Sequence, residues 1–428
     1  MHGVRAEVEQ APVSDCAGVR RTARGARHDT ETSREPTAPS ACLDNLVSLI
    51  ILSVALSPRE KEIVALLRAQ PVLDAAGLAR SLGTSKGAIA VALSSLTQKG
   101  EVVGRSYVLR GEPWAVVVGG AAWDIKARSL AAARLHTSNP GSVSQTPGGV
   151  GRNIAEGIAR LGGRVHLVAA VGADAAGRDL LARTAAAGVY VGQVAAGPHP
   201  TGSYLAALGA DGELVIGVSD FAATDALDVA AVARSRELIV RADVVVIDGN
   251  IPAGVIAWTI AVAAAAGARV VLEPVSVVKA ARLAPLFAPE RPVFAITPNV
   301  DELGALVGHE VTEDVTAIAS AAGELIARGV NHVWVSCGAA GSLLVSSDGV
   351  ITIAAIPAEV RDVTGAGDAM TAGFVHGLLN GEPPATAARH GHLAAALTVA
   401  SKHTVPPDLG VAFAAALASE PTEAVARP

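Results

Sequence analysis

The chain has 428 residues, half of them apolar, which is enough for two or three domains with a large core. Its formal charge of −6 excludes an obvious polyanion binder, at least for the molecule as a whole. The three cysteines, Cys16, Cys42 and Cys337, have no metal-ligand spacing, and their odd number does not make a disulfide framework. We therefore expect a protein of the reducing cytoplasm.

The N-terminal segment mixes Arg, Glu, Ser, Thr and Pro without periodicity, so residues 1–44 are expected to be a disordered tail. Its arginines could contact nucleic acid, although a solvated tail or a misassigned start codon explains the same composition. The apolar run at residues 46–56 is too short to span a bilayer and lies too far along the chain for a signal peptide. We expect no membrane association.

Residues 57–112 predict three short helices and a hairpin. Ser57 is a good N-cap for the first helix, and Glu60 completes a capping box three residues later. A second helix is expected over residues 74–82 and a third over residues 84–100. Residues 101–109 then read as two short strands with a turn between them.

This order of elements resembles the winged helix-turn-helix family, which we predict over residues 45–112. Residues 57–112 carry eight Lys and Arg against five Asp and Glu, a net positive charge inside an acidic protein. Lys86 and Arg105 lie where contacts to DNA would be made. The third helix is rich in alanine, with few side chains able to read base edges, so the same fold could instead serve dimerisation or docking.

From Trp114 onward, apolar runs typical of strands alternate with alanine-rich runs typical of helices. The strand-like runs are residues 114–118, 165–171, 244–247, 270–272, 293–296 and 332–336, and the helical ones are 154–161, 175–186, 253–266 and 315–328. Alternation of this kind predicts an α/β fold, a mostly parallel sheet with helices on both faces. Ligands of such sheets bind at the carboxyl ends of the strands.

One region interrupts the alternation. Asp211 and Gly212 stand between two β-type runs, at residues 202–208 and 214–218, which is a strong hairpin signal. We predict a small β lid at about residues 200–220, able to keep water away from a reacting group.

Residues 362–379 contain the most informative stretch, Asp-Val-Thr-Gly-Ala-Gly-Asp followed by a helical pattern. Gly365 and Gly367 allow a tight turn and close approach to a ligand, and the helix start offers N–H groups to an anion. A carboxylate there, Asp368, suits a base that takes a proton from a hydroxyl beside a bound phosphate. The alternative is a plain glycine-rich turn whose Asp interacts with the helix dipole.

Two further loops are candidates for the substrate side. Asp124 follows the first strand, and Gly148 and Gly149 precede the helical segment that contains Asn153. Each has a plainer interpretation, as a turn residue or a helix entry. No Walker lysine follows either loop, which excludes a P-loop enzyme.

The chain from Trp114 onward resembles the PfkB, or ribokinase-like, family of carbohydrate and nucleoside kinases. Its two signatures are a Gly-Gly-x-x-x-Asn loop, here beginning at Gly148, and Asp-x-x-Gly-Ala-Gly-Asp, here beginning at Asp362. The resemblance implies a ribokinase-like, doubly wound sheet over residues 113–428 and an ATP-dependent kinase that uses Mg²⁺.

The resemblance also implies roles for individual residues. An anion hole and base are implied at Gly365, Ala366, Gly367 and Asp368, and substrate binding at Asp124, Gly148, Gly149 and Asn153. ATP binding is implied at Ser336, Gly338, Gly341 and His392, a water-mediated magnesium site at Asn299 and Glu302, and a monovalent cation such as K⁺ at Asp362.

Within the family, the first signature loop, the Asp-Ile-Lys at residues 124–126 and the run at residues 273–280 are most similar to pseudouridine kinases. These enzymes phosphorylate the 5′-hydroxyl of a C-nucleoside. Trp123 and Gly151 depart from the residues expected at their positions. The alternatives are kinases of ribose, adenosine or inosine, or a nucleoside-sensing transcriptional regulator; we expect a homodimer in either case.

Overall fold

The computed structural model describes residues 56–69, 74–102 and 112–419. The predicted tail at residues 1–44 and nearly all of the apolar run at 46–56 lie outside the described residues. So does most of the predicted hairpin at 101–109. None of the helices in the described part of the chain is long and apolar enough to cross a membrane.

Three helices follow Leu56, as predicted: α1 (Pro58–Ala69), α2 (Ala75–Ser81) and α3 (Lys86–Gln98). The capping box at the start of α1 is confirmed, because Ser57 N donates to Glu60 Oε2 at 2.6 Å and Glu60 N donates to Ser57 Oγ at 3.3 Å. Ile63, Leu78 and Ile89 come from the three helices and share one buried apolar cluster. The winged helix-turn-helix and DNA binding through residues 57–112 stay predictions.

The central sheet has eight strands in the order β14-β13-β12-β11-β10-β9-β1-β4. Its strands are β1 (Trp114–Val118), β4 (Arg164–Val168), β9 (Val244–Asp248), β10 (Arg269–Glu273), β11 (Val293–Ile296), β12 (Val330–Ser336), β13 (Ser342–Ser346) and β14 (Gly349–Ile353). The six strands from β4 to β12 in this order pair parallel with one another, whereas β13 pairs antiparallel with both β12 and β14. The predicted mostly parallel sheet is therefore confirmed.

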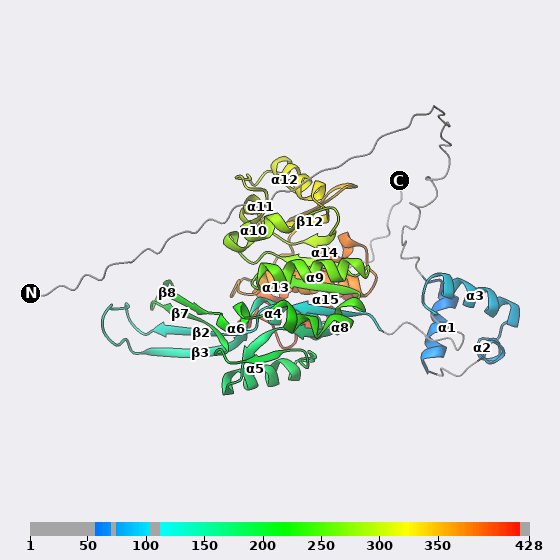
Figure 1. Cartoon of the computed structure of the whole chain (residues 1–428), viewed down its shortest axis with the longest axis horizontal. Coiled ribbons are helices and arrows are strands. Elements are labelled where there is room, and N and C mark those ends of the chain that lie inside the picture. Colours follow the sequence, from blue (N-terminus) through cyan, green and yellow to red (C-terminus); the bar gives the residue numbers. More distant parts are fainter. Residues whose placement is uncertain (1–55, 70–73, 103–111, 420–428) are drawn as a thin grey trace, which may run out of the picture. The chain divides into compact units, whose positions relative to one another are not determined.

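Helices cover both faces of this sheet (Figure 1). Val116 and Val118 belong to the buried cluster of one face, and Ala115 and Val117 to that of the other, as expected of alternating strand residues. The first face is covered by α7 (Val229–Ala233), α8 (Arg236–Val240), α9 (Ala253–Ala265), α10 (Val277–Leu283), α11 (Val300–Val307) and α12 (Val315–Ala327). The second is covered by α4 (Val150–Arg160), α5 (Ala175–Ala186), α13 (Ala366–Leu379) and α14 (Pro384–Val399), against which α15 (Leu409–Ser419) packs.

A second sheet of four strands, in the order β3-β2-β7-β8, projects from one side of the domain (Figure 1). Its strands are β2 (Ala122–Ser129), β3 (Gly141–Gly148), β7 (Gly202–Leu208) and β8 (Leu214–Asp220), and we call it the lid sheet. The predicted hairpin is confirmed as β7 and β8. A pair of three-residue strands, β5 (Ala170–Gly172) and β6 (Ala195–Gly197), and the short helix α6 (Ala222–Asp225) complete the domain.

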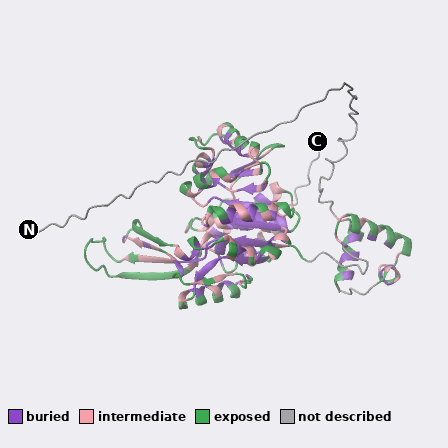
Figure 2. Cartoon of the chain, viewed as in Figure 1, coloured by how far each residue is buried: buried purple, intermediate pink, exposed green. Residues whose placement is uncertain are grey.

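Two strands of the lid sheet were not predicted. We took the residues around Asp124 and Gly148 for loops, and this was wrong: Asp124 lies within β2, and Gly148 is the last residue of β3. Neither strand carries the apolar alternation that identifies a half-buried strand, because β3 is largely exposed and β2 only partly buried (Figure 2).

The register of the lid sheet gives it two different faces. Asp124 and Lys126 lie two residues apart on β2 and therefore share one face. Cross-strand pairing puts Ile125, Leu205 and Val218 in one row of the opposite face and Ala127, Val143, Ala207 and Ile216 in the next. Val143, Ile216 and Val218 are more than half exposed, so the second face presents apolar side chains to solvent.

Candidate active site

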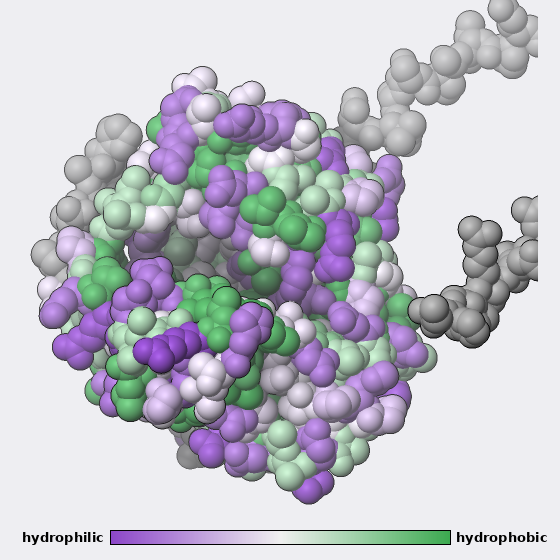
Figure 3. All heavy atoms as spheres, turned by 90° about the vertical axis from the view of Figure 1, so that its left-hand side faces the viewer, coloured by the Kyte–Doolittle hydropathy of each residue, from purple (hydrophilic) through white to green (hydrophobic). Residues whose placement is uncertain are grey.

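A cavity of about 300 Å³ lies beyond the carboxyl ends of the central strands, where ligands of such sheets bind. Its lining includes Glu273, Thr297 and Ser336 at or just after strand ends, Asn299 and Glu302 at the start of α11, and Val363, Gly365, Ala366, Gly367 and Asp368 from the second signature. Figure 3 shows the side of the molecule from which the lid sheet projects, and this side is visibly hollowed. Two stretches far apart in the sequence thus meet at one cavity.

The start of α13 has the geometry expected of an anion site. Gly365 is the N-cap and has a left-handed backbone with φ of 83°, and a Cβ there would stand 2.6 Å from Thr404 O, so only glycine fits. Ala366 N donates to Val363 O. The N–H groups of Gly367 and Asp368 belong to the first turn, where donors have no partner within the helix, and both residues line the cavity.

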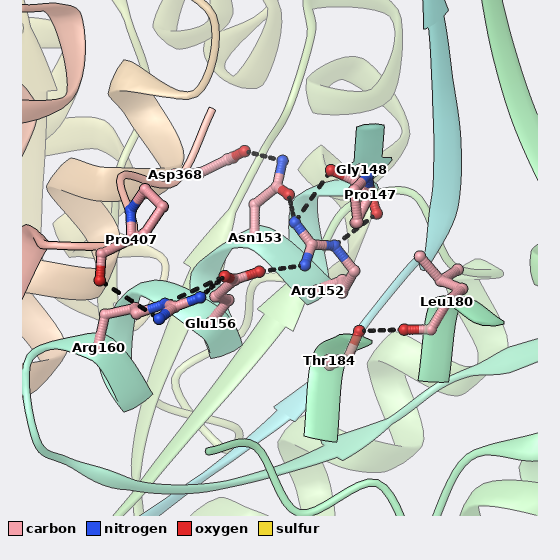
Figure 4. Close-up of polar contacts among 10 residues, drawn as sticks. All are labelled: Pro147, Gly148, Arg152, Asn153, Glu156, Arg160, Leu180, Thr184, Asp368 and Pro407. Carbon is pink, nitrogen blue, oxygen red and sulfur yellow. Dashed lines mark hydrogen bonds and ion pairs between the residues drawn. The ribbon is translucent and has the colours of Figure 1, made fainter. Parts of the chain in front are cut away.

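Asp368 is held against the first signature. Asn153 Nδ2 donates to Asp368 Oδ2 at 2.8 Å, joining α4 to α13 (Figure 4). Burial raises the pKa of Asp368 to about 7, the Asn153 hydrogen bond opposes this, and the negative charges of Asp248 and Asp124 add to it. A carboxylate with a pKa near neutrality is well matched to accept a proton in the cell.

Arg152 fixes the first signature loop from inside. Its buried guanidinium donates to Gly148 O at 3.0 Å and to Pro147 O at 3.1 Å, and it pairs with Glu156 (Figure 4). It also donates to Asn153 Oδ1, which leaves the amide nitrogen of Asn153 directed at Asp368. The guanidinium of Arg152 therefore stabilises the loop.

Asp124, which is predicted to bind the substrate, lies against Gly148, since a Cβ on Gly148 would fall 2.2 Å from Asp124 Oδ2. Burial raises the pKa of Asp124, and the charges of Arg152 and Lys126 oppose the rise. The neighbouring Trp123, unexpected at this position, is buried and donates its indole N–H to Ala176 O. Asp124, Gly148, Gly149 and Asn153 thus come together around the entry to α4.

Asp248, which the sequence did not single out, ties the two glycine loops together. Its Oδ2 accepts from Gly120 N at 2.9 Å and Gly151 N at 3.0 Å, and its Oδ1 accepts from the backbone and side-chain nitrogens of Asn250. Four N–H donors suit an ionised carboxylate, although burial raises the pKa of Asp248. The unexpected Gly151 is explained too, because a Cβ there would meet Gly119 Cα at 2.7 Å.

Asn299 and Glu302 form a capping box at the start of α11. Asn299 Oδ1 accepts from Glu302 N at 2.8 Å, and Glu302 Oε2 accepts from Asn299 N at 3.0 Å. Burial raises the pKa of Glu302, and the backbone hydrogen bond from Asn299 opposes the rise. The sequence pattern therefore has a structural role as well as a place at the cavity.

Glu273, at the end of β10, is a second buried carboxyl that sequence reasoning missed as a site residue. Its Oε2 accepts from Thr297 Oγ1 at 2.5 Å and from Thr371 Oγ1 at 2.8 Å, so it links the end of β11 to α13. Burial raises the pKa of Glu273 to about 8; the Thr297 bond opposes this, and the charges of Glu302 and Asp368 add to it. A signal existed, since Asp248 and Glu273 both end apolar strands with an acidic residue.

The donors around this cavity fit Mg²⁺. Glu302, Asn299, Glu273 and Asp368 offer oxygen atoms, the ligands that this ion prefers. Among the described residues, no three His, Cys, Asp or Glu side chains are close enough to hold a metal by themselves. That suits an ion that keeps several waters and binds through few carboxylates together with substrate phosphates.

The predicted nucleotide-side residues do not all reach the cavity. Ser336 lines it, whereas Gly338, Gly341 and His392 are not among the lining residues. His392 is buried, with its Nε2 2.7 Å from Ser342 Oγ. Gly341 has a φ of 98°, and a Cβ there would fall 2.2 Å from Ile353 O, which gives this glycine a structural reason.

Asp362 has a partner that the sequence did not suggest. Lys126 Nζ of the lid sheet donates to Asp362 Oδ2 at 3.0 Å, and Thr364 N donates to Asp362 Oδ1 at 2.9 Å. Burial opposes ionisation, but the hydrogen bonds of Thr364 and Lys126 outweigh it and lower the pKa of Asp362. A monovalent cation at Asp362 stays a prediction.

Comparison with known proteins agrees with this geometry. The family model of the pfkB family carbohydrate kinases matches residues 115–409. The chain belongs to the pfkB family of carbohydrate kinases. It is therefore a phosphotransferase with an alcohol group as acceptor, and membership of this kinase family implies ATP as the donor.

Two relatives can be aligned with this chain over nearly their whole length. The pseudouridine kinase of Escherichia coli strain K12 is 33% identical over 308 residues, 71% of this chain and 96% of that protein. An uncharacterized sugar kinase of the same strain, YeiI, is 32% identical over 353 residues, 82% of this chain and 96% of that protein. The second match is longer than the stretch from Ala115 to Pro428, so it includes residues before the kinase domain.

Two solved structures show the ribokinase-like fold. A carbohydrate kinase from Agrobacterium tumefaciens is 28% identical with a TM-score of 0.61, over 72% of this chain and 97% of that one. Arabidopsis thaliana ribokinase complexed with ribose and ATP is 25% identical with a TM-score of 0.62, over 71% of this chain and 99% of that one.

Asp248→Asn should destabilise the domain. An asparagine can keep one accepting oxygen but turns an NH₂ group toward N–H donors, so buried donors lose their acceptor at a cost of about 1–3 kcal/mol each. Urea unfolding of the full chain measures the loss. The control is Asp179→Asn, because Asp179 makes an exposed ion pair with Arg183 and should change stability by about 0.5 kcal/mol or less. Equal stability of the two variants would show that Asp248 carries a proton and is not the acceptor inferred here.

Proposed function

We propose that the chain transfers the γ-phosphoryl group of ATP to the 5′-hydroxyl of a nucleoside, with pseudouridine as the first candidate. The observation that carries this proposal is the Asn153–Asp368 hydrogen bond, which joins the two family signatures at one cavity. The 33% identity to pseudouridine kinase along almost all of that protein supports the choice of substrate.

In the proposed mechanism Asp368 is the general base. Asp124, Gly149 and Asn153 hold the sugar. The oxygen of the 5′-hydroxyl attacks the γ-phosphorus while Asp368 accepts the proton of that hydroxyl, and the bond between the γ-phosphorus and the ADP oxygen breaks. The first-turn N–H groups of Gly367 and Asp368 then face the charge that develops on the transferred group.

The nucleotide is proposed to extend from Ser336 toward Gly338, Gly341 and His392. Asn299 and Glu302 would hold Mg²⁺ through water, where the ion would neutralise phosphate charge. Glu273 bonds to Thr297 and Thr371 and so fixes the cavity floor between the metal side and the base helix.

A panel of acceptors decides the substrate. With ATP and Mg²⁺, we expect phosphorylation of pseudouridine with a kcat/KM about tenfold or more above that of ribose, adenosine and inosine, because a site that hydrogen-bonds its substrate discriminates against analogues that leave those groups unpaired. Formation of ADP and of the 5′-phosphate is measured for each acceptor. Preference for ribose or for a purine nucleoside would replace pseudouridine by that acceptor, and turnover of none would refute the proposed nucleoside kinase activity.

Asp368→Asn should remove nearly all turnover while leaving ATP affinity within about threefold, because the side chain keeps its size but can no longer accept the proton.

In the wild type, kcat/KM should rise with pH and level off at high pH, with the midpoint of the rise near the pKa of Asp368, about 7, since only the ionised carboxylate is a base. Initial rates from pH 5.5 to 9 measure this. A variant that keeps a tenth of the wild-type rate would remove Asp368 from the role of base.

We also propose a homodimer formed through the apolar face of the lid sheet. This face carries the exposed Val143, Ile216 and Val218, and the edge strands β3 and β8 flank it. A contiguous exposed apolar face on a β sheet marks an interaction surface, and the same face on a second copy is complementary to it in character.

Ile216→Asp should convert the dimer into a monomer, because it places a charge on the apolar face that the two copies would bury. Sedimentation velocity at micromolar concentration measures the change. Val411→Asp is the matched control, since Val411 is a similarly exposed residue on α15, outside the lid sheet. A wild type that sediments as a monomer, or an Ile216 variant that stays dimeric, would contradict the proposed interface.

A further inference from the structure

The cavity has an excess of acidic side chains, which would repel the phosphoryl group that the proposed reaction transfers. Its ionisable lining residues, Glu273, Glu302 and Asp368, are all acidic, and among the described residues the lining holds no Lys, Arg or His. Transfer of a phosphoryl group brings further negative charge to the same place, and enzymes of this chemistry stabilise it with positive charge and N–H donors. A positively charged side chain close to the cavity could therefore stabilise the transferred phosphoryl group.

Arg152 is a buried cation in the first signature loop, but its guanidinium is already engaged. Its guanidinium bonds to Gly148 O, Pro147 O, Asn153 Oδ1 and the Glu156 carboxylate. Turning it toward a phosphoryl group would break the hydrogen bonds that shape the first signature loop. Arg152 therefore holds this loop and is not available to stabilise the phosphoryl group.

Lys126 is placed differently. It lies on β2 of the lid sheet, two residues from Asp124 and on the same face, so it shares the side of the lid that carries the substrate-side carboxylate. Its charge acts on Asp124, opposing the rise in the pKa of that group. Its Nζ donates to Asp362 Oδ2 at 3.0 Å, three residues before the N-cap of α13.

The contact between Lys126 and Asp362 can be exchanged. The two side chains are 41% and 33% exposed, and ion pairs that are open to solvent contribute little to stability. A phosphoryl group at the start of α13 offers more negative charge than one carboxylate, and the ammonium is a compact charge on a flexible stem. Movement of the lid, which carries Lys126, can transfer it from one partner to the other.

We propose that Lys126 is a catalytic cation delivered by the lid, which leaves Asp362 when the lid closes and contacts the transferred phosphoryl group. The inference rests on the proposed kinase function and adds a residue to it. It also gives the lid an electrostatic task besides the exclusion of water.

The first test is kinetic. Lys126→Met keeps the length of the side chain without its charge and should lower kcat by about 100-fold, as when one donor to a developing negative charge is removed. Lys126→Arg should recover part of the loss, because it restores the positive charge. Arg128→Met is the matched control: Arg128 is the next cation along the same face of β2, but it donates to Ala210 O at the lid turn, and its loss should change kcat less than threefold.

The second test separates contact with the phosphoryl group from a role in holding the lid. Titration calorimetry compares pseudouridine with pseudouridine 5′-phosphate as ligands of the wild type and of Lys126→Met. We expect the phosphate-bearing ligand to lose at least tenfold in affinity and the nucleoside less than twofold. Equal losses for both ligands, or none for either, would overturn the inference.

These outcomes are distinct from failure of the proposed function. A wild type that phosphorylates no acceptor of the panel would refute the kinase proposal itself. A wild type that is active, with a Lys126→Met variant equally active, would refute only the role of Lys126.

Discussion

The site depends on one close approach of two backbones. Gly119, after β1, and Gly151, in the first turn of α4, leave no space for a Cβ between them, and Asp248 accepts a hydrogen bond from the residue after Gly119 and from Gly151 itself. This contact sets where α4 begins, and α4 carries Asn153, whose amide reaches Asp368 on α13. A buried carboxylate thereby helps to set the distance between the first signature loop and Asp368.

Negative charge is the second constraint. Asp368, Glu273 and Glu302 line one cavity. Burial raises the pKa of Asp368 to about 7, with the charges of Asp248 and Asp124 adding to it, and raises the pKa of Glu273 to about 8, with the charges of Glu302 and Asp368 adding to it. Such a cluster is costly unless cations arrive with the substrates. In our proposal this acidic cavity depends on the Mg²⁺ that accompanies ATP and on Lys126, and Asp368 acts in it as the base.

The sequence was informative where a pattern is local and less so where a residue acts through space. Apolar runs predicted the six parallel strands, and the glycines of residues 362–368 predicted the helix start, because both depend on nearest neighbours. β2 and β3 were missed, since their exposed polar residues show no alternation. The acidic residue at the end of the strand could have marked Asp248, but its partners could not be predicted, because Asp248 bonds to residues about a hundred positions away. The partner of Asp362 could not be predicted either, since Lys126 lies more than two hundred positions from it.

In the lid sheet, side chains alternate between two faces, one proposed to serve catalysis and the other dimerisation. Along β2, Asp124 and Lys126 point to one face and Ile125 and Ala127 to the other, so every residue added to the strand contributes to only one of the two surfaces. A shift of register by one residue would turn the charges toward solvent and the apolar side chains toward the substrate. In the proposed dimer, burial of the apolar face would hold β2 in register and would keep Asp124 and Lys126 on the opposite face.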